Sequence, residues 1–96
     1  MIRIVKMTFR PEAVPEFLEM FGGIKNAIAG FEGCQSLRLL QCTDPSNVLF
    51  TYSTWETPEH LERYRASELF AKTWKQTKTW FAAPAEAWSV DTLEEL

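Results

Sequence analysis

The chain has 96 residues, of which 46% are hydrophobic and 14% aromatic, and its formal net charge is −3. This length suits one domain with one core, so we expect residues 1–96 to form a single domain. Its first residues carry charges at Arg3 and Lys6 and no apolar signal region, so we expect the domain to be cytoplasmic. Lys and Arg are scattered and give no basic field for nucleic acid, and no stretch approaches the roughly 20 apolar residues that a membrane span requires.

The N-terminal part predicts a strand followed by a helix. The segment "IRIVKMTF" (2–9) alternates and is rich in β-branched residues, and Pro11 can end this strand and open a helix. Apolar residues then recur at three- and four-residue steps, which predicts a helix to about Ala29. The stripe consists of Val14, Phe17, Leu18, Phe21, Ile24 and Ile28. Gly22 and Gly23 interrupt it at a cost of about 1–2 kcal/mol relative to alanine, so we expect a kink or a close contact with neighbouring backbone there.

The next segments predict a β-hairpin. "CQSLRLLQC" (34–42) reads as a strand, "TDPSN" (43–47) as a turn and "VLFTYSTW" (48–55) as an antiparallel return strand. Cys34 and Cys42 would lie roughly 26 Å apart along an extended strand, too far for a disulfide, so we expect two reduced thiols. With one histidine in the chain and no CxxC motif, no metal site is expected.

The C-terminal part predicts two helical pieces and a last strand. Thr57 is a natural N-cap for a helix with Pro58 at its first position. After a bend at 65–67, a second piece should run from Ser67 to about Ala82, where Pro84 would end it. Its apolar stripe contains Phe70, Trp74, Thr77 and Phe81. The segment "EAWSVDTLE" (86–94) alternates and predicts a final strand before an acidic tail.

The resulting order β-α-β-β-α-β predicts an α+β, ferredoxin-like fold, in which a four-stranded antiparallel sheet carries helices on one face. Neither alternating set of side chains in the first and third strands is strongly polar, so the uncovered face of the sheet requires a partner. A domain this small buries only about 60–65% of its unfolded surface, which also favours association. We therefore expect a homodimer in which two sheets lie face to face and form a dimeric α+β barrel.

Three features resemble the antibiotic biosynthesis monooxygenase domain family. They are "GFEGCQSLRLLQ" (30–41), "YSTWETPEHLERYRASELF" (52–70), and the aromatic helix that precedes a short last strand. The resemblance implies a homodimer with one small-molecule cavity per subunit, between sheet and helices. Some relatives oxygenate anthrone- or quinol-like aromatic molecules without metal or flavin, because an electron-rich substrate anion can itself reduce O₂. Another branch binds and degrades haem.

The chain departs from the family pattern at its histidines. Relatives often carry histidine at the position of Tyr64 and again near Leu69, and neither is present. The Asn, Trp and haem-ligating His of the haem-degrading branch would fall near Val5, Tyr64 and Trp74, and none of the three is kept. We therefore expect no metal and no cofactor, and haem degradation is the less favoured activity.

We assign Tyr64, Trp74 and His60 as candidate catalytic residues, each with a structural alternative. Trp74 lies where relatives place a ligand-contacting side chain, and its N–H could donate to an oxyanion, although an aromatic stripe such as Phe70 and Trp74 is also typical of a core. Tyr64 could be a polar cavity group or a half-buried tyrosine with its hydroxyl in water. His60, in the first turn of a helix, could be a neutral base or a surface residue.

The remaining candidates concern the ligand and the partner chain. The residues expected to bind substrate are Val5, Met7, Phe70, Leu61 and Arg38. Arg38 could instead pair with an acidic residue across the dimer, which we favour. Trp55 and Trp88 are expected to pack structurally, whereas Trp80 points away from the aromatic stripe and could meet the second subunit.

Two functional hypotheses remain open. The first is a cofactor-independent monooxygenase that acts on a small, flat, electron-rich aromatic molecule. The second is a non-catalytic small-molecule-binding or stress-related module on the same fold.

Overall fold

The computed structural model describes residues 1–96 and shows the predicted order of elements. They are β1 (Ile2–Thr8), a short 3-10 helix η1 (Pro11–Ala13), α1 (Val14–Ala29), β2 (Cys34–Gln41), β3 (Val48–Trp55), α2 (Pro58–Arg65), α3 (Glu68–Lys78) and β4 (Glu86–Val90). The four strands form one antiparallel sheet in the order β2-β3-β1-β4. The predicted ferredoxin-like α+β fold is confirmed.

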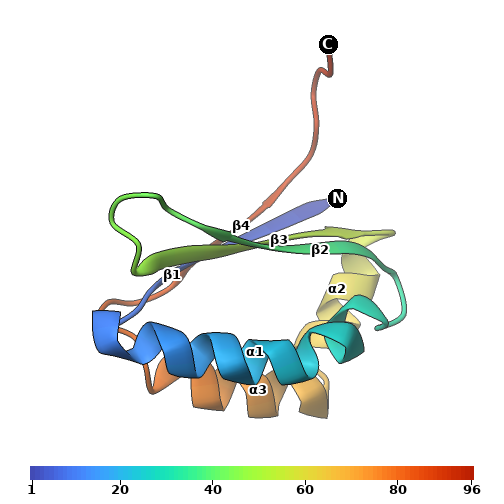
Figure 1. Ribbon diagram of the computed structural model, residues 1–96. Helices are drawn as coiled ribbons and strands as arrows, with labels where there is room; N and C mark the ends of the chain where they lie inside the picture. Colours follow the sequence, from blue (N-terminus) through green and yellow to red (C-terminus); the bar gives the residue numbers. More distant parts are fainter.

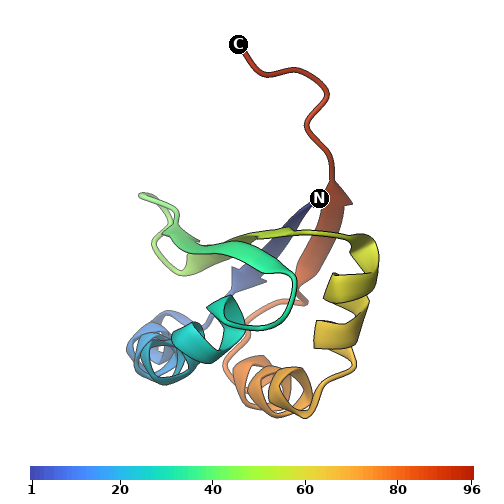
Figure 2. The same cartoon turned by 90° about the vertical axis from the view of Figure 1, so that its right-hand side faces the viewer.

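The helices cover one face of the sheet and leave the other bare (Figure 1). α1 and α3 lie side by side beneath the sheet, and α2 stands at one end of it (Figure 2). The segment 91–96 extends away from the sheet on the side that has no helices (Figure 1). One face of the sheet therefore lies against the helices, while the bare face has no cover from its own chain.

α1 is continuous through Gly22 and Gly23. A methyl group added at either glycine would meet no other atom within 4 Å. The predicted close contact with neighbouring backbone is therefore wrong, and the two glycines remain simply weak helix formers in an exposed part of α1.

Two elements are shorter than predicted. α3 ends at Lys78, because the N–H groups of Thr79 and Trp80 bond the carbonyl oxygens three residues earlier, each at 3.1 Å, and tighten the chain into a turn. Pro84 therefore does not end this helix. β4 ends at Val90, which pairs with Ile2 at the first position of β1, so residues further along the chain have no strand to bond.

The core lies between the sheet and α1, and it includes a tryptophan that we expected at a subunit contact. Its members are Met7, Phe9, Ala13, Phe17, Phe21, Leu49 and Trp80. Trp80 is only 8% exposed and meets the ring of Phe17 edge-on at 6.5 Å. The prediction that Trp80 meets a partner is wrong, because the turn after α3 carries its side chain inward.

The other two tryptophans outside α3 differ from one another. Trp55 is 1% exposed, and its indole N–H donates to the Ser53 hydroxyl at 3.0 Å, so its predicted structural role is confirmed. Trp88 is 45% exposed on β4, so within one subunit the prediction that it packs structurally is wrong. Its place on the bare face, opposite Ile4, explains this exposure.

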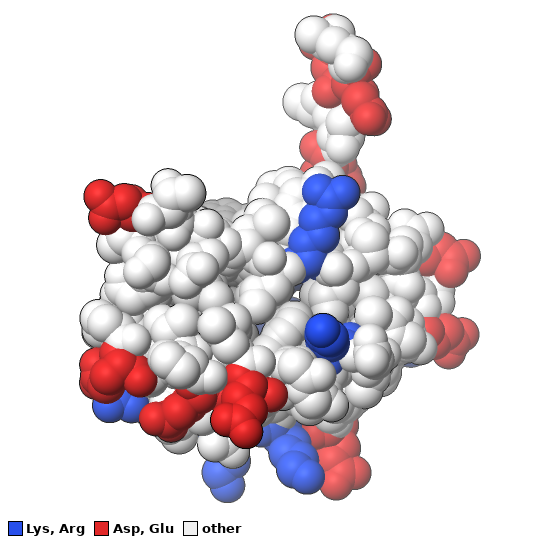
Figure 3. All heavy atoms as spheres, in the orientation of Figure 1, with Lys and Arg blue, Asp and Glu red and all other residues white.

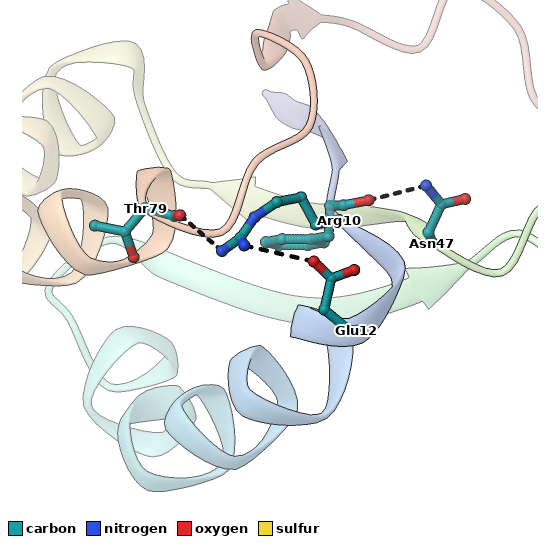
Figure 4. Close-up of polar contacts among 5 residues, drawn as sticks. Arg10, Glu12, Asn47 and Thr79 are labelled. Carbon is teal, nitrogen blue, oxygen red and sulfur yellow. Dashed lines mark hydrogen bonds and ion pairs between the residues drawn. The ribbon is translucent and has the colours of Figure 1, made fainter.

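Polar contacts of Arg10 and Asn47 join three segments at one end of the core (Figure 4). Its guanidinium donates to the backbone oxygen of Thr79 at 3.1 Å and lies 3.5 Å from the Glu12 carboxylate. Nearby, the Asn47 side-chain amide donates to the backbone oxygen of Phe9 at 2.9 Å. These contacts hold the end of β1 against the end of α3 and the hairpin between β2 and β3.

Candidate functional site

A cavity of about 280 Å³ lies between the helix-covered face of the sheet and the helices. It is lined by 21 residues, of which 15 are hydrophobic. Six predicted site residues line it together: Val5, Met7, Leu61, Tyr64, Phe70 and Trp74. The cavity is therefore mainly apolar, as most small-molecule sites in proteins are.

Strand alternation and helix periodicity direct these side chains into one space. Val5 and Met7 are two residues apart on β1, so they point to the same face of the sheet. α3 begins after Ser67, whose hydroxyl accepts the backbone N–H of Phe70 at 3.1 Å and so acts as the N-cap. Phe70 and Trp74, one turn apart on α3, then face the sheet across the cavity.

Aromatic rings form flat walls in the cavity. Phe70 and Trp74 stack with a centroid distance of 5.8 Å and an interplanar angle of 11°. Tyr64 stacks on Trp55 at 5.2 Å and meets Phe70 edge-on at 5.3 Å. The rings of Phe31, Trp55 and Phe70 all contact Tyr64 and hold it in place, so the cavity wall offers aromatic ring surfaces to a planar ligand.

Two polar groups in these walls are free. The Tyr64 hydroxyl and the Trp74 indole N–H have no hydrogen-bond partner within the chain, and no buried polar side-chain atom is left unsatisfied. Both groups must therefore be reachable by solvent or by a ligand. An indole N–H can only donate, and a neutral tyrosine hydroxyl can donate as well as accept.

The Tyr64 hydroxyl is a donor at neutral pH. Burial, followed by the nearby Cys34, raises the pKa of Tyr64 to about 12. Burial likewise raises the pKa of the Cys34 thiol, so neither group is ionised near pH 7. Tyr64 is thus suited to donate a hydrogen bond to an oxyanion, not to remove a proton.

This shift predicts a loss of stability at alkaline pH. Tyr64 keeps its proton in the folded chain up to about pH 12 but would ionise near pH 10 when unfolded, so its contribution is complete below about pH 10 and is lost as pH rises through 12. We expect the wild type to lose more free energy of unfolding between pH 9 and pH 11 than Tyr64→Phe does. Urea unfolding at fixed protein concentration measures both. Parallel pH curves for the two proteins would contradict the shift.

Two predicted site residues lie elsewhere. The Nδ1 atom of His60 is 2.7 Å from the Thr57 hydroxyl, its ring packs over the backbone of Gly33, and it does not line the cavity. Arg38 lies on the bare face of the sheet, with its guanidinium 5.9 Å from the ring centre of Tyr52. Neither side chain is therefore in position to touch a ligand in the cavity.

Sequence reasoning missed two arginines that line the cavity, Arg3 and Arg65. Arg3 donates to the Ser89 hydroxyl at 3.0 Å, and Arg65 pairs with Glu62 at 3.0 Å. A signal for both was present in the sequence. Arg3 lies two residues before Val5 on β1, so both side chains point to the same face of the sheet. Arg65 lies one helical turn after Leu61 on α2, so these two side chains also share a face.

A second pocket of about 200 Å³ between α1 and α3 is lined by only six residues, three of them hydrophobic. No three His, Cys, Asp or Glu side chains come together in a way that could hold a metal ion. The face of the protein seen in Figure 3 is largely uncharged, with isolated basic side chains and acidic ones near its edges. None of the helices combines the length and hydrophobicity needed to cross a bilayer.

The sequence of this chain matches one protein family, and its fold matches several solved structures. A profile of the family described as "Antibiotic biosynthesis monooxygenase" matches residues 1–76. No curated protein sequence matches this chain.

Several solved structures have the same fold. Rv0793 from Mycobacterium tuberculosis is 18% identical with a TM-score of 0.88, over 98% of this chain and 95% of that one. A conserved protein from Methanosarcina mazei Go1 is 22% identical with a TM-score of 0.83, over 90% and 86%. A protein described as an antibiotic biosynthesis monooxygenase is 14% identical with a TM-score of 0.88, over 98% and 100%. At these identities the likeness establishes a shared fold and nothing finer.

Proposed function

This chain belongs to the antibiotic biosynthesis monooxygenase family, and from that premise we propose that it oxygenates a small, flat, electron-rich aromatic molecule in the cavity. The observation that carries the proposal is the pair of free donors, the Tyr64 hydroxyl and the Trp74 N–H, in the aromatic walls of a mainly apolar cavity. Donors in such a site stabilise a developing oxyanion far more than they would in water.

The chemistry requires little of the protein. An electron-rich quinol anion can pass an electron to O₂, and when a ring C–H becomes C–OH and the quinol becomes a hydroxyquinone, one oxygen atom enters the product and the other leaves in water. The cavity would hold the ring between its walls, and Tyr64 and Trp74 would stabilise the substrate anion. No Asp, Glu, His or Lys lines the cavity, so the substrate's proton would pass to water. The donors assist this step, because hydrogen bonds to an anion lower the pKa of its conjugate acid.

The cavity volume limits the size of the substrate. A cavity of about 150 Å³ accommodates benzene. The volume here, about 280 Å³, is nearly twice as large and therefore suits one or two fused rings. A quinol of that size fits, whereas a haem macrocycle would extend well beyond the cavity.

Oxygen uptake by the purified protein with a panel of one- and two-ring hydroquinones tests the proposal. We expect uptake above the autoxidation rate, and a kcat about 10- to 100-fold lower in Tyr64→Phe and Trp74→Phe, since each loses one donor to the anion. Tyr52→Phe and Trp88→Phe are matched controls, because both residues lie on the bare face of the sheet. Equal rates in all four variants would disprove the roles of Tyr64 and Trp74.

A non-catalytic binding module is the second candidate. It is favoured by the absence of any carboxylate or imidazole that could remove a proton within the cavity. This candidate predicts saturable binding of aromatic molecules without uptake of O₂. Multiple-turnover oxygen consumption by the protein would exclude it.

The bare face supports a homodimer, which we propose on the same family basis. Opposite residues on this face form a row across the sheet, Arg38, Tyr52, Ile4 and Trp88, and the row beside it contains Leu40 and Phe50. Leu40, Trp88 and Val90 are 44%, 45% and 38% exposed in the single chain. A second copy packed against this face would bury these apolar side chains and leave the cavities on the outer sides of the dimer.

A further inference from the structure

The charge in the cavity is entirely positive. Of the six lining residues that are not hydrophobic, two are arginines, Arg3 and Arg65, and the others are serine or threonine. No carboxylate lines the cavity to balance the two guanidinium groups. Guanidinium groups stay ionised in proteins, so an otherwise apolar cavity carries two permanent positive charges.

The two guanidinium groups are close enough to act on one another. Burial lowers the pKa of Arg3 first, the charge of Arg65 lowers it further, and Glu62 acts in the opposite direction. Glu62 is the one acidic partner of the pair, and its side chain is 66% exposed at its contact with Arg65. Such an exposed ion pair is screened by solvent, and Glu62 does not itself line the cavity.

Both arginines keep hydrogen-bond donors free. In each of them a single guanidinium nitrogen donates, that of Arg3 to Ser89 and that of Arg65 to Glu62, while a guanidinium carries five N–H donors. The Arg65 side chain is 44% exposed, which places this charge where the cavity opens to solvent. A ligand with its rings inside could therefore present an anionic group to both arginines at the opening.

We infer that the cavity binds a one- or two-ring aromatic carboxylate, with its rings between the aromatic walls and its carboxylate against Arg3 and Arg65. A carboxylate is ionised at pH 7, whereas a phenol, with a usual pKa near 10, is neutral there. Arginine also matches a carboxylate in shape, because two parallel N–H groups bond its two oxygens. The inference rests on the proposed function in using the same cavity, and it names the class of substrate.

A fixed carboxylate would also orient the substrate. With the acid group against the arginines, the opposite edge of the rings points into the cavity, which Tyr64 and Trp74 also line. The two arginines would then select and position the molecule, and the free donors would act on its reacting oxygen. Neutral quinols of the same size would lack this anchor.

Calorimetric titration of the purified protein at pH 7 with 2-naphthoate, 2-naphthamide and 2-naphthol tests the inference. The three probes share a ring system, and only the first is an anion at this pH. We expect 2-naphthoate to bind about 10- to 100-fold more tightly than the two neutral probes, as charge-assisted hydrogen bonds imply. Arg3→Gln and Arg65→Gln should each remove most of this preference and leave the binding of 2-naphthamide unchanged.

Arg63→Gln is the matched control, because Arg63 lies two residues before Arg65 on the same helix and does not line the cavity. Arg65→Gln keeps the test decisive if Arg3→Gln fails to fold, since Arg65 is largely at the surface. Equal affinities for the three probes, no binding of any of them, or an equal loss in Arg63→Gln would each overturn the inference.

The two proposals fail separately. If neutral and carboxylated hydroquinones are oxidised with equal kcat/KM, the oxygenase proposal stands and the inference falls. If 2-naphthoate binds through the arginines and no hydroquinone is oxidised, the inference stands and the oxygenase proposal falls.

Discussion

Gly33→Ala is expected to lower the free energy of unfolding by about 2–5 kcal/mol. Gly33 has φ of +88°, a backbone conformation that residues with a side chain rarely adopt, and a Cβ atom there would overlap the imidazole of His60. The backbone cannot shift easily. Its carbonyl oxygen accepts the N–H of Glu56 at 2.8 Å, and the next N–H, of Cys34, bonds Phe31 at 2.9 Å.

Urea unfolding at one fixed protein concentration measures this loss, and two variants divide it into parts. Gly22→Ala is the control, since a methyl group there meets nothing within 4 Å, and it should raise stability by up to about 1 kcal/mol. His60→Ala in the Gly33→Ala background should recover the steric part of the loss and leave the backbone part. If Gly33→Ala is as stable as Gly22→Ala, the proposed strain at this turn does not exist.

This result would also explain in physical terms why a glycine stands at position 33. Gly33 lies in the segment through which the chain resembles its family, and the structure shows that it turns the chain from α1 into β2. The ring of His60 occupies the space that the missing side chain leaves. His60 therefore has a structural environment at this turn, outside the cavity in which a base was expected.

Leu40→Glu is expected to weaken the proposed dimer at least 100-fold. Leu40 is 44% exposed on the bare face of the sheet, so the single chain should tolerate a carboxylate there. In a dimer that covers this face, each subunit would contribute one buried and unpaired charge, at a cost of several kcal/mol. The two copies of the substitution act together because the interface is symmetric.

Sedimentation equilibrium measures the dimer directly, as a mass of 11.1 kDa or twice that value. Leu18→Glu is the matched control, because Leu18 is 43% exposed but lies on α1, on the other side of the molecule from the bare face. Trp88→Glu should act as Leu40→Glu does, since Trp88 is 45% exposed on the same face. A monomeric wild type, or an equal effect of Leu18→Glu and Leu40→Glu, would refute this interface.

The order of the elements could be read from the sequence because it depends on neighbours along the chain. Alternation in 2–9 and 48–55 predicted β1 and β3 nearly to the residue, and Thr57 with Pro58 marked the start of α2. The placement of Phe70 and Trp74 on one face of a helix followed from their four-residue spacing. Six of the eight predicted site residues line the cavity, because strand alternation or helical spacing places them on the inward faces of their elements.

The predictions that were wrong depended on contacts between distant segments. α3 ended before Pro84 because the chain must turn to bring Phe81 beside Phe9, and this turn buried Trp80. β4 stopped at Val90 because β1 offers no further partner. Neither result can be read from periodicity, which says nothing about where the partner strand begins.

The sequence by itself determined the helices, the strands and the side chains that share a face of each element, because these follow from local backbone geometry. Only the tertiary structure decided which faces meet. It brought Arg3 of β1 and Arg65 of α2 to one cavity, and it placed Arg38 on the opposite side of the sheet. The physical reason is that a binding site joins residues far apart in the chain, and strand pairing together with helix packing sets the distances between them.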